Sequence, residues 1–160
     1  MKVFKEITQP VILPHWGLDV LLLIPRIVCG YLLTANFGAD KFGLPWSPVD
    51  ANLGFFEVAF WFPNDVADYG GIFAMFPVFF AWMAAFSEAV GGVFLLLGLQ
   101  TRFTSFLILC TMLGAIFLQQ WQQGMWMMLP AMGFLWVSIF YLALGGGRFS
   151  VDYLISNKRK

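Results

Sequence analysis

The sequence predicts an all-α, polytopic membrane protein: a four-transmembrane-helix bundle with an extra interfacial or re-entrant aromatic helix between the first and second spans. Composition supports this class, because 60% of the residues are hydrophobic and only 11% are charged, whereas charged residues make up about a quarter of soluble domains. The length agrees, since 160 residues hold about four spanning helices of roughly 20 residues each and short tails. We therefore interpret residues 1–160 as a single membrane domain.

The apolar segments place the elements in order along the chain. Each predicted span has about the length that crosses a bilayer, and the four cover residues 17–38, 72–99, 103–121 and 125–144. Between the first two spans, residues 52–62 are aromatic, too short to cross the membrane and bracketed by prolines. We expect an interfacial helix there, which serves either as an aromatic belt that seats the protein or as a lid over a site.

The distribution of charge orients the bundle. Four spans put both termini on the same side of the membrane. Basic residues gather on that side, at Lys2, Lys5, Arg102, Arg148, Lys158, Arg159 and Lys160. Because such residues favour the cytoplasmic face, we expect an integral protein of the cytoplasmic (inner) membrane with both termini in the cytoplasm.

Two ionisable residues lie within the predicted spans, Arg26 in the first and Glu88 in the second. Arg26 follows Trp16 by ten residues and Glu88 precedes Gly98 by ten, so counting from the cytoplasmic side places both roughly 15 Å deep. Each lone charge at the bilayer centre costs about 2.5–3.5 kcal/mol, which favours pairing. We predict a buried Arg26–Glu88 ion pair. It either fixes the helix register alone or marks a ligand or proton path.

Small residues are expected to bring these helices together, and polar residues gather at both membrane boundaries. The residues of close approach are Gly30, Gly91 and Gly92. On the outer side we expect either a polar vestibule or a solvated loop at Asn36, Asp40, Lys41, Gln119 and Gln122. On the cytoplasmic side we expect a small charge network, or helix caps, at Asp19, Arg102, Arg148 and Asp152.

The sequence also limits the cofactors. His15 is the only histidine, so a haem held by two histidines of one copy and a histidine-rich metal centre are excluded. The two cysteines, Cys29 and Cys110, are expected at different depths and do not form a C-x-x-C motif, which argues against a disulfide and thiol redox chemistry. We expect no metal and no covalently bound cofactor.

Three motifs in order resemble those of the DoxX family of four-helix membrane proteins. They are Arg26 and Gly30 with Lys41 at the outer helix end, E-x-x-G-G-x-x-L-L-L-G-L-x-T-R from Glu88 to Arg102, and G-x-G-R-x-S-x-D from Gly145 to Asp152. The resemblance covers nearly the whole chain, although Pro25 and the aromatic insert at residues 43–71 depart from it. The family takes its name from a subunit of a thiosulfate:quinone oxidoreductase.

The resemblance implies an accessory or quinone-interacting subunit of a membrane oxidoreductase complex, which is not active alone. Arg26, Glu88 and Tyr141 would then bind a quinone carbonyl or relay a proton. Two alternatives remain open: a non-catalytic scaffold or assembly subunit that packs against membrane proteins or lipid, and a small-solute or proton transporter. The expected partners are the lipid bilayer, membrane or peripheral redox subunits and further copies of the chain, but not nucleic acid.

Overall fold

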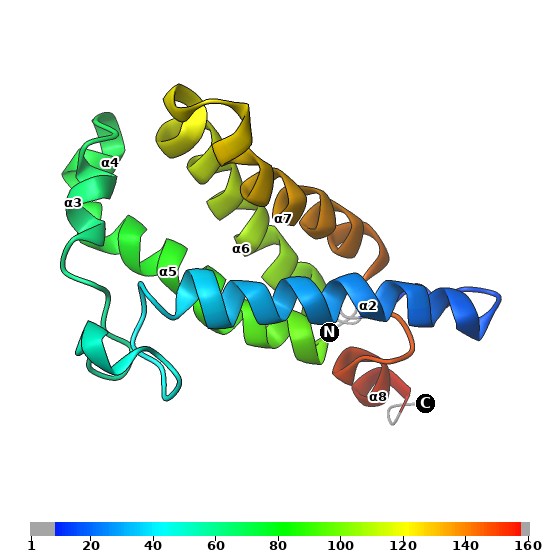
Figure 1. Ribbon diagram of the computed structural model, residues 1–160. Coiled ribbons are helices and arrows are strands. Elements are labelled where there is room, and N and C mark those ends of the chain that lie inside the picture. Colours follow the sequence, from blue (N-terminus) through cyan, green and yellow to red (C-terminus); the bar gives the residue numbers. More distant parts are fainter. Residues whose placement is uncertain (1–8, 158–160) are drawn as a thin grey trace.

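The computed structural model describes residues 9–157, which fold into four long helices and several short ones (Figure 1). The four helices long and apolar enough to cross a membrane are Trp16–Gly38, Pro77–Leu97, Thr101–Gln123 and Met125–Leu144. Residues 9–157 contain no β-strand beyond an isolated bridge between Phe42 and Val58. The predicted fold class is therefore confirmed. The basic residues Lys2, Lys5, Lys158, Arg159 and Lys160 lie outside the described residues.

Two of the spans continue into tighter or wider helical turns. The spans consist of α2 (Trp16–Leu32) with the π-helix η1 (Leu33–Gly38), α5 (Pro77–Leu97), α6 (Thr101–Gly114) with η3 (Ala115–Gln120) and η4 (Trp121–Gln123), and α7 (Met125–Leu144). The short helices are η2 (Val49–Ala51), α3 (Phe62–Ala67), α4 (Gly71–Met75) and α8 (Val151–Asn157). The second span thus begins five residues later than residue 72, because the chain breaks at Phe76 (φ −133°) and restarts with Pro77 at the first helical position.

α5 is the central helix of the bundle. Of its most apolar stretch 44% is buried, against 28% for the first and fourth spans and 33% for the third. Its glycines serve two interfaces. A Cβ atom at Gly92 would lie 2.8 Å from the carbonyl oxygen of Gly30, so α2 and α5 are in backbone contact there, whereas Gly91 faces Thr104 and Ile108 of α6.

The aromatic insert does not contain the predicted helix at residues 52–62. The chain becomes helical only at Phe62, and the stretch before it is a folded loop. Asn52 (φ 47°) and Phe56 (φ 62°) have left-handed backbone conformations that a helix cannot accommodate. The carboxylate of Glu57 also accepts the backbone N–H of Gly54 at 2.6 Å, which stabilises a turn in place of a helical turn.

The two ends of the described chain lie side by side at one end of the bundle, where Gln9 and Asn157 line the same small cavity. We call this the terminal end. At the opposite end, which we call the insert end, α3 packs on α5, and Phe42 lies fully buried below the loop. The insert end contains the candidate site.

Candidate ligand-binding site

Arg26 and Glu88 lie at different levels of the bundle and have different partners. Arg26 donates hydrogen bonds to the carbonyl oxygens of Gly146 and Phe149 at the terminal end. Glu88 instead forms an ion pair with Lys41, with Nζ and Oε2 2.6 Å apart. The predicted Arg26–Glu88 pair is therefore wrong.

The reason is the register of the two helices. The residue opposite Arg26 is Gly98, directly after α5, where an added Cβ would lie 2.7 Å from the Arg26 guanidinium. Gly98 is ten residues from Glu88, which is roughly 15 Å along a helix. The sequence count assumed that Trp16 and Gly98 lie at equal depth, but α2 extends past the end of α5 (Figure 1).

Arg26 belongs to a set of contacts that ties the chain after α7 to α2. Arg148 places its Nε 3.3 Å from Oδ2 of Asp19, and its backbone N–H donates to Oδ1 of Asp19 at 3.2 Å. The hydroxyl of Tyr141 donates to the carbonyl oxygen of Leu22, next to the bond that Pro25 leaves unmade in α2. Tyr141 is thus engaged at the terminal end, remote from Glu88.

The other predicted residues of this end make separate contacts. Asp152 accepts the backbone N–H groups of Gln100 and Thr101 at 2.7 and 2.8 Å, and therefore caps the start of α6 from outside that helix. Arg102 donates to the carbonyl oxygen of Ala143 at 3.1 Å. The four predicted residues thus lie in one region, but they make separate contacts that stabilise helix ends and do not form a single charge network.

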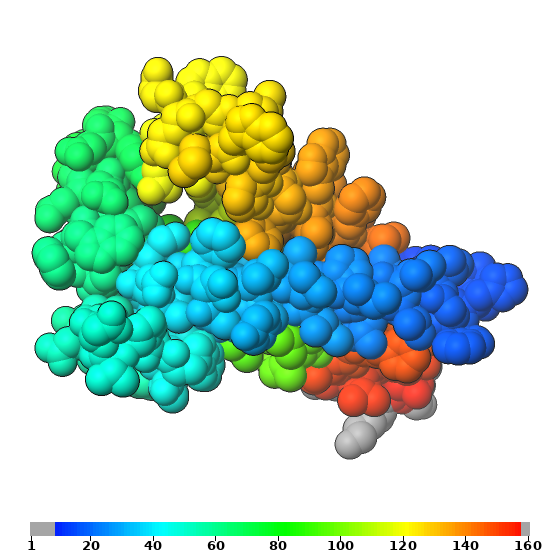
Figure 2. All heavy atoms as spheres, viewed as in Figure 1, coloured from blue at the N-terminus to red at the C-terminus, as the bar shows by residue number. Residues whose placement is uncertain are grey.

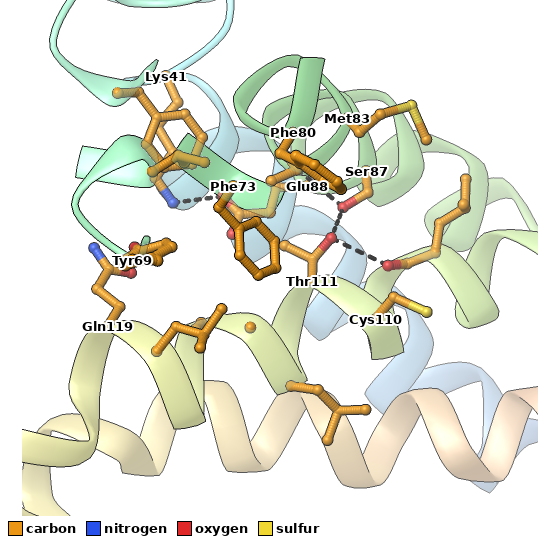
Figure 3. Close-up of a pocket in the computed structure, with 18 of the residues that line it drawn as sticks. Lys41, Tyr69, Phe73, Phe80, Met83, Ser87, Glu88, Cys110, Thr111 and Gln119 are labelled. Carbon is orange, nitrogen blue, oxygen red and sulfur yellow. Dashed lines mark hydrogen bonds and ion pairs between the residues drawn. The ribbon is translucent and has the colours of Figure 1, made fainter. Parts of the chain in front are cut away.

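The insert end contains a cavity of about 640 Å³ between α3, α4, α5 and the α6–η3 helix. Figure 2 shows the hollow between the 62–75 segment and the end of the third span. Its wall is largely apolar, and its aromatic side chains are Phe62, Tyr69, Phe73, Phe79 and Phe80. The polar groups are few: Lys41, Ser87, Glu88, Thr111 and Gln119, with the thiol of Cys110 (Figure 3).

The Lys41–Glu88 ion pair is the main polar feature of this cavity. Glu88 is only 4% exposed, and the side chain of Lys41 is 19% exposed. The Lys41 ammonium also lies 5.3 Å from the ring centroid of Phe62, within the range of a cation–π interaction. The pair is thus held between α5 and the insert, with one side facing the cavity (Figure 3).

The backbone explains how Lys41 reaches Glu88. Gly38 ends the π-helical turns of the first span directly against Ala89, where a side chain would not fit. The next residues turn back, with the N–H of Lys41 donating to the carbonyl of Gly38 at 3.1 Å and the carbonyl of Lys41 accepting from Ala59 at 2.9 Å. Hydrogen bonds at both the backbone N–H and the backbone carbonyl of Lys41 therefore fix its position.

The predicted outer polar cluster is divided by the structure. Lys41, in the turn after η1, and Gln119, on η3, line the same cavity from opposite sides. Asn36, Asp40 and Gln122 are exposed and lie outside its lining. The three predicted glycines support this end indirectly, because Gly30 and Gly92 join α2 to α5 and Gly91 lets α6 approach.

Sequence reasoning did not single out three polar residues of the cavity, Tyr69, Ser87 and Thr111. Ser87 and Thr111 are polar residues inside apolar spans, and that feature is the signal that would have indicated them. Tyr69 lies in the turn after α3, where burial raises the pKa of its phenol, and the nearby carboxylates of Asp65, Asp68 and Glu88 raise it further. Tyr69 therefore stays a neutral donor at physiological pH.

The family model described as DoxX matches residues 21–121. The chain belongs to the DoxX family. The match includes the second span, the insert and most of the first and third spans, so Lys41, Glu88 and Thr111 all lie within it. Neither the comparison with curated proteins nor that with solved structures found a match. Family and fold together make this DoxX protein an integral membrane protein with a partly polar cavity beside its central helix.

Proposed function

We propose that this DoxX protein binds a quinone from the bilayer, as an accessory subunit of a membrane oxidoreductase complex. The observation that carries the proposal is the Lys41–Glu88 ion pair in the wall of a largely apolar cavity. Ligand pockets commonly enclose about 300–1,000 Å³, with apolar walls and a few placed polar groups. A quinone headgroup is a planar apolar ring with polar oxygens and has the matching chemistry.

Each side chain has a distinct role in this proposal. The Lys41 ammonium donates a hydrogen bond to one quinone oxygen, and the aromatic rings of Phe73 and Phe80 pack on the quinone ring. The Glu88 carboxylate keeps Lys41 charged and in place, so that Lys41 gives a proton to that oxygen as it is reduced, and water supplies the second proton. Reduction of a quinone takes up two electrons and two protons, and in this proposal the electrons come from a partner redox subunit.

Membrane orientation is part of the same proposal. We infer a cytoplasmic membrane with both termini in the cytoplasm, because Arg102 and Arg148 lie at the terminal end and basic residues favour that face. The Lys41–Glu88 pair then lies near the outer leaflet. The test introduces Asp50→Cys or Asn157→Cys as the single cysteine of the chain and labels intact cells with a membrane-impermeant maleimide. Labelling at position 50 alone is expected, and labelling at position 157 alone would contradict the orientation.

Binding is tested with the full chain in lipid nanodiscs and the probe 2,3-dimethyl-1,4-naphthoquinone. Its quinone ring is fully substituted, so it does not add to the thiol of Cys110. We expect saturable binding above that of empty nanodiscs, and about tenfold weaker binding after Lys41→Met, which removes a charged hydrogen bond. Asp40→Asn is the matched control, because Asp40 is exposed and outside the cavity. Binding equal to that of empty nanodiscs would refute the proposal.

The partner is tested by copurification from native membranes. The proposal expects a redox subunit to accompany the chain, and quinone-linked turnover of that complex to fall in Glu88→Gln while the complex stays assembled. Full turnover in an assembled Glu88→Gln complex would contradict a role for the site. Association with membrane proteins that have no redox activity would favour the scaffold alternative instead.

A further inference from the structure

A second polar pair lies in the same cavity, formed by hydroxyl groups of two helices. The Oγ of Ser87 on α5 and the Oγ1 of Thr111 on α6 are 2.5 Å apart. Both residues line the cavity, and Figure 3 shows them joined near Glu88. Ser87 is only 1% exposed and Thr111 is partly buried, so the Ser87 hydroxyl depends on partners within the protein for its hydrogen bonds.

The two hydroxyl groups of this pair carry fewer protons than the pair has hydrogen-bond contacts. Ser87 lies 2.9 Å from the carbonyl oxygen of Ala84, and Thr111 lies 3.1 Å from that of Leu107. With the bond between the hydroxyls this makes three contacts, but two hydroxyls carry only two protons. Either hydroxyl can therefore turn toward a ligand at little cost, because both carbonyls lie within helices that supply backbone donors.

The two pairs face the cavity from adjoining points of α5. Ser87 and Glu88 are consecutive, so their side chains leave the helix about 100° apart. Glu88 turns toward Lys41 in the turn after η1, and Ser87 turns toward Thr111 of α6. The cavity therefore offers two separate polar points, one charged and one neutral, with Phe73 and Phe80 beside them (Figure 3).

We propose that the Ser87–Thr111 pair donates to a second oxygen of the bound ligand, and that the ligand is accordingly a para-quinone. An amphiphile with a single polar end, such as a fatty acid, would occupy only the charged pair. A para-quinone carries two carbonyl oxygens on opposite sides of one ring and uses both polar points. This inference rests on the quinone-binding function proposed above and names the residues that decide ligand class.

The test compares the binding of two probes to single and double variants of the full chain in nanodiscs. The probes are 2,3-dimethyl-1,4-naphthoquinone and 2,3-dimethyl-1-tetralone, which keeps one carbonyl on the same bicyclic frame. The variants are Ser87→Ala and Thr111→Val. Their matched controls are Ser138→Ala and Thr104→Val, because these hydroxyls are buried outside the cavity and donate to the backbone carbonyls of Phe134 and Leu99.

We expect the double variant that combines Ser87→Ala with Thr111→Val to bind the quinone roughly three- to tenfold more weakly, which is the loss of one neutral hydrogen bond, and to bind the tetralone as wild type does. The controls should change neither. Equal losses for both probes, or no loss for the quinone, would overturn the inference while quinone binding by wild type still upholds the proposed function. Absence of quinone binding by wild type would overturn both. Circular dichroism confirms that each variant is folded.

Discussion

The contact between Gly92 and the first helix predicts that two adjacent glycines respond in opposite ways to the same substitution. A methyl group at Gly92 would lie 2.7 Å from the backbone nitrogen of Thr34 and 2.8 Å from the carbonyl oxygen of Gly30. A methyl group at Gly91 would lie 3.5 Å from its nearest neighbour, a methyl carbon of Thr104, which is ordinary van der Waals contact.

The size of the effect follows from these distances. Ordinary contact begins at 3.4 Å, so Gly92→Ala must push α2 away by about 0.7 Å, against backbone atoms that cannot rotate aside. Overpacking of this kind costs about 1–3 kcal/mol. Both substitutions gain the same helix propensity of about 1 kcal/mol, so the difference between the two variants isolates the contact.

The assay is reversible unfolding in mixed dodecyl maltoside and dodecyl sulfate micelles, followed by circular dichroism. We expect Gly92→Ala to be less stable than Gly91→Ala by about 1–3 kcal/mol. Gly92→Ala should also weaken quinone binding, because movement of α2 carries Lys41 away from Glu88. Equal stability of the two variants would refute the packing interpretation, and intact binding in a destabilised Gly92→Ala variant would refute the coupling to the site.

Three further predictions concern single side chains. Arg26→Lys keeps a cation but loses the planar fork that reaches the carbonyls of Gly146 and Phe149, so the free energy of unfolding should fall by about 1.5–3 kcal/mol; an unchanged value would contradict this. Asp152→Ala removes the acceptor for the first N–H groups of α6 and should lower the same quantity by about 1.5–3 kcal/mol, whereas the exposed Asp40→Ala should have little effect. The difference in absorbance titration between wild type and Tyr69→Phe should give a pKa above 10 for Tyr69; the stability linked to its neutral form is present below pH 10 and is lost as the pH rises through this raised pKa, and a midpoint at or below 10 would disprove the effect of burial.

The four spans could be predicted because their signal is local. Residues 125–144 form one unbroken apolar run, and α7 has those bounds. The insert could not be assigned in the same way, because its aromatic residues suit a helix as well as a loop. The left-handed conformation of Phe56 and the side-chain bond of Glu57 decide between them, and neither follows from hydrophobicity.

Glu88 could be recognised as exceptional from the sequence, but its partner could not. Charge in an apolar span requires a partner whatever the fold, which is a statement about one residue and its solvent. The choice between Arg26 and Lys41 depends on the axial register of α2 and α5. A shift of ten residues in that register leaves both helices equally apolar, so hydrophobicity does not reveal it. Only the contacts of Gly30, Gly38 and Gly98 fix that register.

The same contacts connect the fold of this DoxX protein to its candidate chemistry. Gly38 ends the first span against Ala89, the residue after Glu88, and the chain then turns back to present Lys41. A longer first helix would carry Lys41 past the carboxylate, and a bulkier residue at position 38 would hold α2 away from α5. The close approach of α2 and α5 is therefore what brings the two charges together, and it leaves the apolar wall and the Ser87–Thr111 pair open to the same cavity. Packing and the proposed ligand recognition are thus two consequences of one helix register.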